Sequence, residues 1–275
     1  MKYADLHIHT CYSDGTFTPA HIIALAKKAG LSCISITDHD SVDAYQNNHL
    51  PAEEDIEIIP GVEFTSNYNN IEVHILGYYI DYSGAWFQER LKAICSDRIK
   101  RMEQMCQKLN RLGMSLNIEE VLKFAGHSCV GRLHLAQVMA RKGFVAHPQK
   151  AFDKYIADNG PAYVSNFRLK PQEVIDVILK AKGVPVLAHP YSLPSKELIP
   201  ELAKAGLMGI EGIYSEHSPS QVAHYKKLAQ EHDLLITGGS DFHGDAKPEV
   251  KIGIAKIPYT LIETLKNAHQ KVLAR

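Results

Sequence analysis

The sequence predicts an α/β fold, a barrel of parallel strands that carries a helical insertion, and three observations support it. Short apolar runs alternate with amphipathic helical patterns over most of the chain, which indicates parallel strands joined by crossover helices. The 275 residues suit one large α/β domain with a smaller insertion. No glycine-rich phosphate loop follows the first strand, which favours a barrel over an open nucleotide-binding sheet.

The first part of the barrel is expected in residues 1–84. A helix begins near Thr18-Pro19 and ends at Gly30, because proline suits a first helical turn and glycine a helix end. A short polar helix follows the second strand, and the turn-forming letters NYNN join the third strand to the fourth. The expected strands cover 2–9, 32–40, 56–66 and 71–80.

A helical insertion is expected in residues 85–170, over the mouth of the barrel. No strong strand pattern occurs there, and helices are expected at 86–113, 117–126, 132–143 and 148–160. The first of these helices carries one apolar stripe, made of Leu91, Ile94, Ile99, Met102, Met105, Leu109 and Leu112.

The barrel is expected to resume over residues 171–275, where strands and helices alternate again. Strands are expected at 184–190, 208–215 and 234–243. Helices are expected at 171–183, 196–206, 218–233 and from about Tyr259 onward.

Composition and charge narrow the partners and the location. The formal net charge is -1, which does not favour a duplex DNA binder. The sequence shows no secretory signal and no apolar run long enough to span a membrane, so a cytoplasmic protein is expected. Five cysteines without a CxxC pair indicate reduced thiols rather than a disulfide framework or a thiolate zinc site.

Histidines and carboxylates recur at the carboxyl ends of the expected strands. In a parallel barrel these ends meet on one face, where barrel enzymes hold their sites. A single strand histidine is more often a buried, hydrogen-bonded one, but burying nine such groups unpaired would cost roughly 2–7 kcal/mol for each neutral polar group. A site for several zinc, manganese or iron ions explains them better. The candidate metal ligands are His7, His9, Asp14, His39, Glu63, His74, His189, Asp241 and His243.

The segments DLHIHTCYSDGTFTP, ITDHD, PGVEF, AHP and GSDFHG resemble the PHP (polymerase and histidinol phosphatase) family, in the family's order and over nearly all of the barrel. The resemblance implies a distorted (βα)7 barrel with a trinuclear metal centre, holding two to three divalent ions of manganese, iron or zinc. It assigns His7, His9, Glu63 and Asp241 to one ion, Asp14, His39 and His243 to a second, and Glu63, His74 and His189 to a third, with Glu63 bridging.

Within the family, the mid-chain insertion is similar to that of small bacterial phosphoesterases that act on nucleoside 3',5'-bisphosphates and on short single-stranded RNA. The resemblance implies removal of the 3'-phosphate from adenosine 3',5'-bisphosphate to leave AMP, and also 5'-to-3' exonuclease activity. A hydroxide bridging two ions is the expected nucleophile. Histidinol phosphatases usually have a histidine where this chain has Asp14. That departure argues against histidinol phosphate, while a metal-binding PHP module without this activity is the non-enzyme alternative.

Six residues are candidates for roles beyond metal binding. His217 is a candidate general acid or an exposed loop histidine, and Asp38 a candidate acceptor that orients a ligand imidazole. Arg132 and His134 open a helix and are expected to bind the substrate's second phosphate, unless Arg132 pairs with a carboxylate. Arg98 would line the same cleft or lie on a solvated helix face, and Tyr191 would stack on a base or lie in the core or at the rim.

Overall fold

The computed structural model describes residues 1–46, 49–50, 55–126, 128–165, 169–193 and 197–275. Among the described helices, none combines the length and the apolar composition needed to cross a membrane. The strands form one sheet in the order β7-β6-β5-β4-β3-β2-β1-β8. They are β1 (Tyr3–Ile8), β2 (Cys33–Ile36), β3 (Glu57–Tyr68), β4 (Ile71–Tyr78), β5 (Val184–Leu187), β6 (Gly209–Tyr214), β7 (Leu235–Gly239) and β8 (Ile257–Pro258).

The sheet curls until β1 meets the end of β7, which confirms the predicted barrel. The backbone N–H of His9 donates to the carbonyl of Phe242, and that of Asp241 donates to the carbonyl of His7, each over 2.9 Å. Ile8 and Phe242 form a parallel bridge at the same place. The loop after β7 therefore lies beside the end of β1.

Strand β4 is antiparallel to both β3 and β5, so the expectation of parallel strands throughout is wrong at this position. Only Asn69 and Asn70 separate β3 from β4, and both have positive φ angles, of 52° and 68°. Two such residues make a hairpin turn, whereas a parallel crossover needs a dozen residues or more. Because β4 runs in reverse, His74 in its first half pairs with Thr65 near the carboxyl end of β3.

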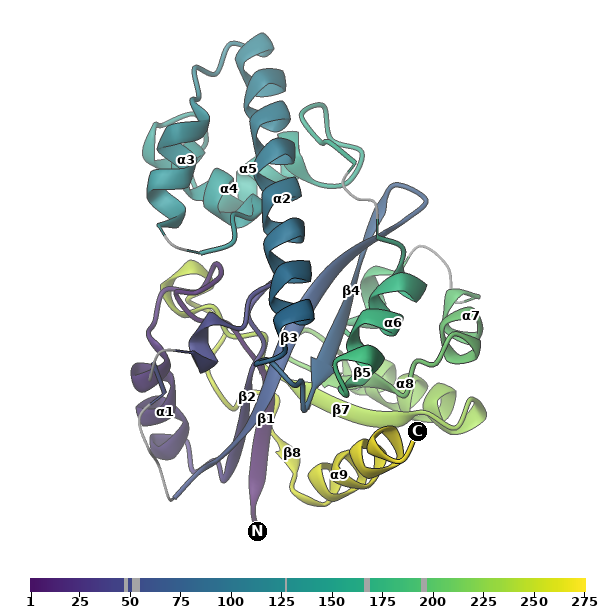
Figure 1. The fold of residues 1–275 in the computed structure, drawn as a ribbon. Helices are drawn as coiled ribbons and strands as arrows, with labels where there is room; N and C mark the ends of the chain where they lie inside the picture. Colours follow the sequence, from purple (N-terminus) through teal and green to yellow (C-terminus); the bar gives the residue numbers. More distant parts are fainter. Residues whose placement is uncertain (47–48, 51–54, 127, 166–168, 194–196) are drawn as a thin grey trace.

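Helices α1, α6, α7, α8 and α9 accompany the barrel strands (Figure 1). The predicted start of the helix at 196 lies outside the described residues. The helix bounds are α1 (Pro19–Lys28), α6 (Pro171–Lys180), α7 (Leu198–Lys204), α8 (Pro219–Glu231) and α9 (Thr260–Leu273). Single 3-10 turns cover Asp43–Tyr45, Pro190–Ser192 and Gly244–Ala246.

Helix α2 (Ala85–Arg111) leaves the barrel and carries α3 (Ile118–Ala125), α4 (Arg132–Arg141), α5 (Pro148–Ala151) and a π-helical turn (Phe152–Ile156) around its far end (Figure 1). We call this group of helices the helical unit. Its apolar side chains pack with one another in a cluster that includes Met105, Leu109, Leu135, Met139 and Ile156, apart from the clusters of the barrel.

The buried face of α2 differs from the predicted apolar stripe. Ile99 is 41% exposed and Leu112 is 47% exposed, whereas Arg98 and Arg101 are buried. The expectation of a solvated helix face for Arg98 is therefore wrong. The reason is a carboxylate from another element, described below, which a helix pattern does not reveal.

A disulfide joins Cys95 in α2 to Cys129, just before α4, with a Cα–Cα distance of 5.4 Å. The expectation that all five thiols are reduced is wrong for this pair, and Cys11, Cys33 and Cys106 are free. Spacing gave no signal, because the two cysteines are 34 residues apart and only the fold brings them together.

Candidate metal centre

His7 and His9 lie at the end of β1 and project from the same face, as residues two apart on a strand do. Their Nε2 atoms are 3.2 Å apart, and both side chains are fully buried. Each Nε2 atom also faces Oδ1 of Asp241, at 3.3 Å from His7 and 3.1 Å from His9. Two imidazoles and a carboxylate thus point at one small volume.

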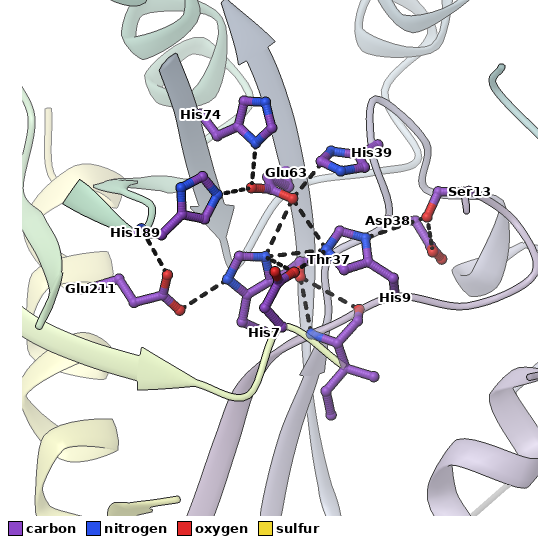
Figure 2. A network of polar contacts seen from close by, with 12 residues as sticks. His7, His9, Ser13, Thr37, Asp38, His39, Glu63, His74, His189 and Glu211 are labelled. Atoms are coloured by element: carbon purple, nitrogen blue, oxygen red, sulfur yellow. Dashed lines mark hydrogen bonds and ion pairs between the residues drawn. The ribbon is translucent and has the colours of Figure 1, made fainter. Parts of the chain in front are cut away.

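Glu63, near the middle of β3, lies at the centre of the cluster (Figure 2). Its Oε1 atom is 2.9 Å from Nδ1 of His74 and 3.1 Å from Nε2 of His189. Its Oε2 atom contacts three further imidazole nitrogens, those of His7 at 3.2 Å, His9 at 3.1 Å and His39 at 3.1 Å. With imidazoles on both oxygens, this carboxylate has the geometry needed to bridge ions.

Asp14 brings a second carboxylate from the loop after β1. Its Oδ1 atom is 3.3 Å from Nε2 of His243 and 3.8 Å from Nδ1 of His9, and its Oδ2 atom is 3.9 Å from Nε2 of His39. His9 and His39 therefore lie between the Asp14 and Glu63 carboxylates.

The side chains form three groups whose candidate ligand atoms lie within 4.8 Å of one another: His7, His9, Glu63 and Asp241; His9, Asp14, His39 and His243; and His39, Glu63 and His74. The first group is the set that the family resemblance implies for one ion. The second adds His9 to the implied set. In the third, His39 takes the place of His189, although His189 contacts the same Glu63 carboxylate.

Three buried atoms of these groups fit a cation, because Asp14 Oδ1, His39 Nδ1 and Glu63 Oε2 lie close to other candidate ligand atoms without forming hydrogen bonds to them. Buried polar atoms are normally satisfied, so several unsatisfied ones in a cluster are what a cation-binding site requires. Imidazoles mixed with carboxylates are also the donors that zinc, manganese and iron accept. The residues present therefore fit divalent metal ions.

Electrostatics in the cluster support this assignment. Burial favours the neutral form of Glu63, but the imidazoles of His39, His7 and His74 outweigh it and hold the pKa of Glu63 well below its usual value. Burial also disfavours charge on His9, yet Asp241 and Glu63 raise the pKa of His9 to about 9. The buried carboxylates therefore favour positive charge at His9.

Three residues that were not predicted from the sequence form hydrogen bonds to the candidate ligands: Glu211, Tyr214 and Lys247. Glu211 in β6 accepts from Nδ1 of His7 and from the backbone N–H of His189, both over 2.9 Å. Asp241 Oδ2 accepts from Lys247 Nζ over 2.7 Å and from the Tyr214 hydroxyl over 2.9 Å. Such partners fix the orientation of metal ligands. Only the position of Glu211 on an expected strand was a signal for these contacts.

Asp38 does not contact a ligand imidazole directly, which corrects its expected role. Its carboxylate accepts from the backbone N–H and hydroxyl of Thr10 and from the hydroxyl of Ser13, each over 2.6 Å. The Ser13 hydroxyl in turn lies 3.4 Å from Nδ1 of His9 (Figure 2). Asp38 therefore anchors the loop that carries Asp14, and it reaches His9 only through Ser13.

His217 is neither a fully exposed loop histidine nor part of the cavity wall. Its Nδ1 atom contacts the carbonyl of Gly212 over 3.1 Å, and its ring packs against Tyr191, Tyr214 and Tyr225. Burial lowers the pKa of His217. His217 forms no hydrogen bond or ion pair with any of the nine candidate ligands, all of which lie in the described part of the chain. Tyr191 lies at the rim and is 44% exposed.

Arg98 is held by Asp40 through Nε over 2.7 Å, by the Thr65 hydroxyl over 2.5 Å, and by the carbonyl of Val130 over 3.3 Å. A buried arginine that bonds residues after β2, in β3 and before α4 ties the helical unit to the rim of the barrel. Arg98 also lines the cavity, as expected for a residue that binds substrate. Its guanidinium, however, already forms hydrogen bonds with Asp40, Thr65 and Val130.

Arg132 pairs with carboxylates, which is one of the two roles that the sequence predicts for it. It contacts Glu72, and its Nη1 atom donates to Asp158 over 2.7 Å. Glu72 also binds Arg101 over 2.6 Å and lies 3.6 Å from Nε2 of His74. His134 is buried, and its Nδ1 atom accepts from the N–H of Gly131 over 3.0 Å. Arg132 still lines the cavity beside the cluster.

A cavity of about 1270 Å³ opens over the cluster. One side is lined by the histidines and carboxylates, another by Arg98, Arg101 and Arg132, and a third by one face of α4. The volume exceeds the roughly 300–1,000 Å³ of a usual small-molecule pocket. A phosphorylated ligand larger than a simple phosphate ester fits this space.

Comparisons with known proteins agree with this geometry. The family model described as PHP domain matches residues 5–84. The chain is 31% identical to the 5'-3' exoribonuclease Rnm of Escherichia coli (strain K12), over 90% of this chain and 87% of that protein. It is 28% identical to the 3',5'-nucleoside bisphosphate phosphatase of Chromobacterium violaceum, over 92% and 91% of the two chains. A solved structure from Bifidobacterium adolescentis, provisionally described as a metal-dependent phosphoesterase, superposes with a TM-score of 0.85 at 28% identity, covering 95% of this chain and 94% of the other.

Proposed function

This chain belongs to the PHP domain family, and from that premise we propose that it is a metal-dependent phosphoesterase acting on nucleotides. The preferred reaction is hydrolysis of the 3'-phosphate of nucleoside 3',5'-bisphosphates, which leaves the 5'-monophosphate. Short single-stranded RNA, hydrolysed from its 5' end, is the second substrate. Relatives that carry these two names cover most of the chain.

The observation that carries the proposal is the position of Glu63, shared by two of the three ligand groups at the base of a large cavity. We assign two to three divalent ions of manganese, iron or zinc to these groups, as a trinuclear centre. When bound, such ions supply an activated water and neutralise charge on the phosphoryl oxygens. The nine side chains named from the sequence are the proposed ligands.

Arg132 is the proposed contact for the second phosphate of a bisphosphate. It lines the cavity, and Glu72, which it pairs with, lies 3.6 Å from the proposed ligand His74. A guanidinium binds phosphate through two parallel hydrogen bonds. Pairing with Glu72 and Asp158 holds it in place, and a phosphate adds a third anionic partner.

The chain is proposed to divide into a barrel, residues 1–84 and 171–275, and a helical unit, residues 85–170, that covers its mouth. The separate apolar cluster of the helical unit supports this division. A cytoplasmic location and the lack of duplex DNA binding stay predictions from the sequence.

A phosphate-release assay with added manganese tests the proposal. Adenosine 3',5'-bisphosphate, histidinol phosphate and a 5'-phosphorylated dinucleotide are compared at equal concentration. We expect release from the bisphosphate, cleavage of the dinucleotide and little release from histidinol phosphate. Turnover of histidinol phosphate alone would favour the histidinol-phosphatase alternative, and turnover of none would favour a metal-binding module without this activity.

A further inference from the structure

The proposed contacts for the two phosphates of a bisphosphate leave one wall of the large cavity without a role. This wall is the face of α4 that follows Arg132. Leu133, Gln137, Ala140 and Arg141 line the cavity, and their spacing places them on one side of the helix. The opposite side packs into the helical unit through Leu135, Ala136, Val138 and Met139. At 1.5 Å per residue, the cavity face extends about 12 Å from Leu133 to Arg141.

Phe124 and Arg141 form a cation–π pair on this wall. The guanidinium carbon of Arg141 lies 4.3 Å from the centre of the Phe124 ring. Phe124 is half-buried, Arg141 is exposed, and both line the cavity. Among the described residues, no carboxylate forms an ion pair with Arg141. An aromatic ring with a guanidinium over it therefore faces the cavity.

This surface is close to the metal centre. The Phe124 ring lies 6.2 Å from the ring of His134, at the start of α4. A Cβ atom built on Gly131, the residue before that helix, would lie 3.9 Å from Oδ2 of Asp14. His134 and Gly131, at the start of α4, thus lie between the Phe124 ring and the proposed ligand Asp14, while Arg141 extends the surface from the far end of the helix.

We propose that Phe124 and Arg141 form a stacking platform for the nucleobase of the substrate. The inference rests on the proposed function, in which the metal centre and Arg132 bind the two phosphates and leave the base unassigned. Bases stack on aromatic rings and on arginine guanidinium planes. Gln137, one turn before Arg141 on the same face, offers an amide donor and acceptor to the base edge.

The test compares two substrates that carry the same phosphates, adenosine 3',5'-bisphosphate and ribose 3,5-bisphosphate, which lacks the base. We expect kcat/KM of the unmodified enzyme to be at least about tenfold higher for the adenosine compound, which corresponds to about 1.4 kcal/mol. Arg141→Gln and Phe124→Leu should each remove most of that preference through a higher KM. Turnover of ribose 3,5-bisphosphate should stay unchanged.

Matched controls come from the same helical unit. Phe144 is half-buried and packs against the same apolar cluster, and Arg111 is exposed at the end of α2. Neither lines the cavity, so Phe144→Leu and Arg111→Gln should keep the preference for the base. A platform is ruled out if the unmodified enzyme shows no preference, or if Arg141→Gln and Phe124→Leu slow both substrates equally.

Failure of the proposed function gives a different result, hydrolysis of neither compound. The platform is then tested by calorimetry with AMP and ribose 5-phosphate in the presence of manganese. Tighter binding of AMP that Arg141→Gln abolishes supports the platform, and equal affinity for the two ligands overturns it.

Discussion

Nδ1 of His7 lies 2.9 Å from Oε1 of Glu211, and both side chains are fully buried. Because the other carboxylate oxygen accepts from the backbone N–H of His189, Glu211 positions two proposed ligands from β6. A buried carboxylate behind a ligand imidazole fixes its tautomer and strengthens it as a donor to metal.

Glu211→Gln should lower metal affinity by about 10–100-fold, the usual effect of losing such a partner. The amide keeps the shape but removes the negative charge that favours a cation at His7. Competition with a chelator measures the affinity. Glu216→Gln is the control, because Glu216 lines the cavity but is exposed and has no contact with His7. Equal affinities for both variants would contradict the role of Glu211.

Glu63→Ala should remove bound metal and phosphatase activity together. Activity should fall by more than about 100-fold, because the loss of a residue that only supports a metal ligand already costs about 10–100-fold. The reason is that both oxygens of Glu63 face ligand imidazoles. Elemental analysis and phosphate release measure the two effects. Glu57→Ala, on the same strand but paired with Lys266 at the far end of the barrel, should keep both. Full activity without Glu63 would disprove the bridging assignment.

Arg132→Lys should raise KM for adenosine 3',5'-bisphosphate by about tenfold or more, and KM for a simple aryl phosphate far less. Lysine keeps a positive charge near Glu72 but cannot form the bidentate hydrogen bonds that arginine makes with phosphate. Arg132→Ala should raise KM in the same pattern and also destabilise the fold, but by less than the cost of about 3–5 kcal/mol for a buried charge left unpaired, because Glu72 keeps Arg101 as a partner. If both substrates suffer equally, Arg132 does not recognise the second phosphate.

Cys129→Ser should lower the free energy of unfolding by about 2–4 kcal/mol, the usual contribution of a disulfide. The bridge ties α2 to the segment before α4, where Arg98 bonds Val130. Denaturant unfolding without reductant measures the effect, and Cys11→Ser, at an exposed free cysteine, should change little. A thiol assay of the denatured protein should count three thiols before reduction and five afterwards, in line with Cys11, Cys33 and Cys106 as the free cysteines. Five thiols before reduction would contradict the bridge.

Metal binding at pH 7 should release about three protons, one each from His7, His9 and His74. Burial opposes charge on His9 and His74, but the carboxylates of Asp241 and Glu63 for His9, and of Glu63 and Glu72 for His74, raise each pKa to about 9. Burial also opposes charge on His7, but Glu211, Glu63 and Asp241 hold the pKa of His7 well above its usual value. All three imidazoles are therefore protonated at pH 7 and must be neutral to bind metal. Affinity should rise with pH through at least about 9.

Calorimetry of manganese binding in two buffers with different ionisation enthalpies measures this release. His74→Gln should release about one proton fewer, and His21→Gln, at an exposed position, should not change it. A binding enthalpy that does not depend on the buffer would contradict the prediction.

The cluster of histidines and carboxylates around Glu63 was predictable because its signal is local. His7, His9 and His39 lie at or just after the ends of strands. The alternation of strands and helices in the sequence shows where each strand ends and therefore on which face of the barrel these residues lie. Asp241 and His243 follow a strand in the same way. Such positions depend on a few neighbouring residues, which a sequence shows directly.

Residues whose role depends on a distant partner were not predictable. Arg98 has the spacing of a helix surface, yet it is buried because Asp40, 58 residues earlier, neutralises it. Glu211 is 204 residues from His7, and Cys95 meets Cys129 only after α2 and α4 have packed. Burial of a charge is favourable only when a partner is in place.

The sequence alone therefore determined the barrel, the helical unit and the types of ligand around Glu63, because apolar periodicity and strand ends are local properties. The tertiary structure decided the reversal of β4, the burial of Arg98, the pairing of Arg132 with Glu72, and the positions of Glu211 and Lys247 behind the candidate ligands. Those features arise from charges and hydrogen bonds between elements far apart in the chain, whose pairing exists only once the barrel has closed.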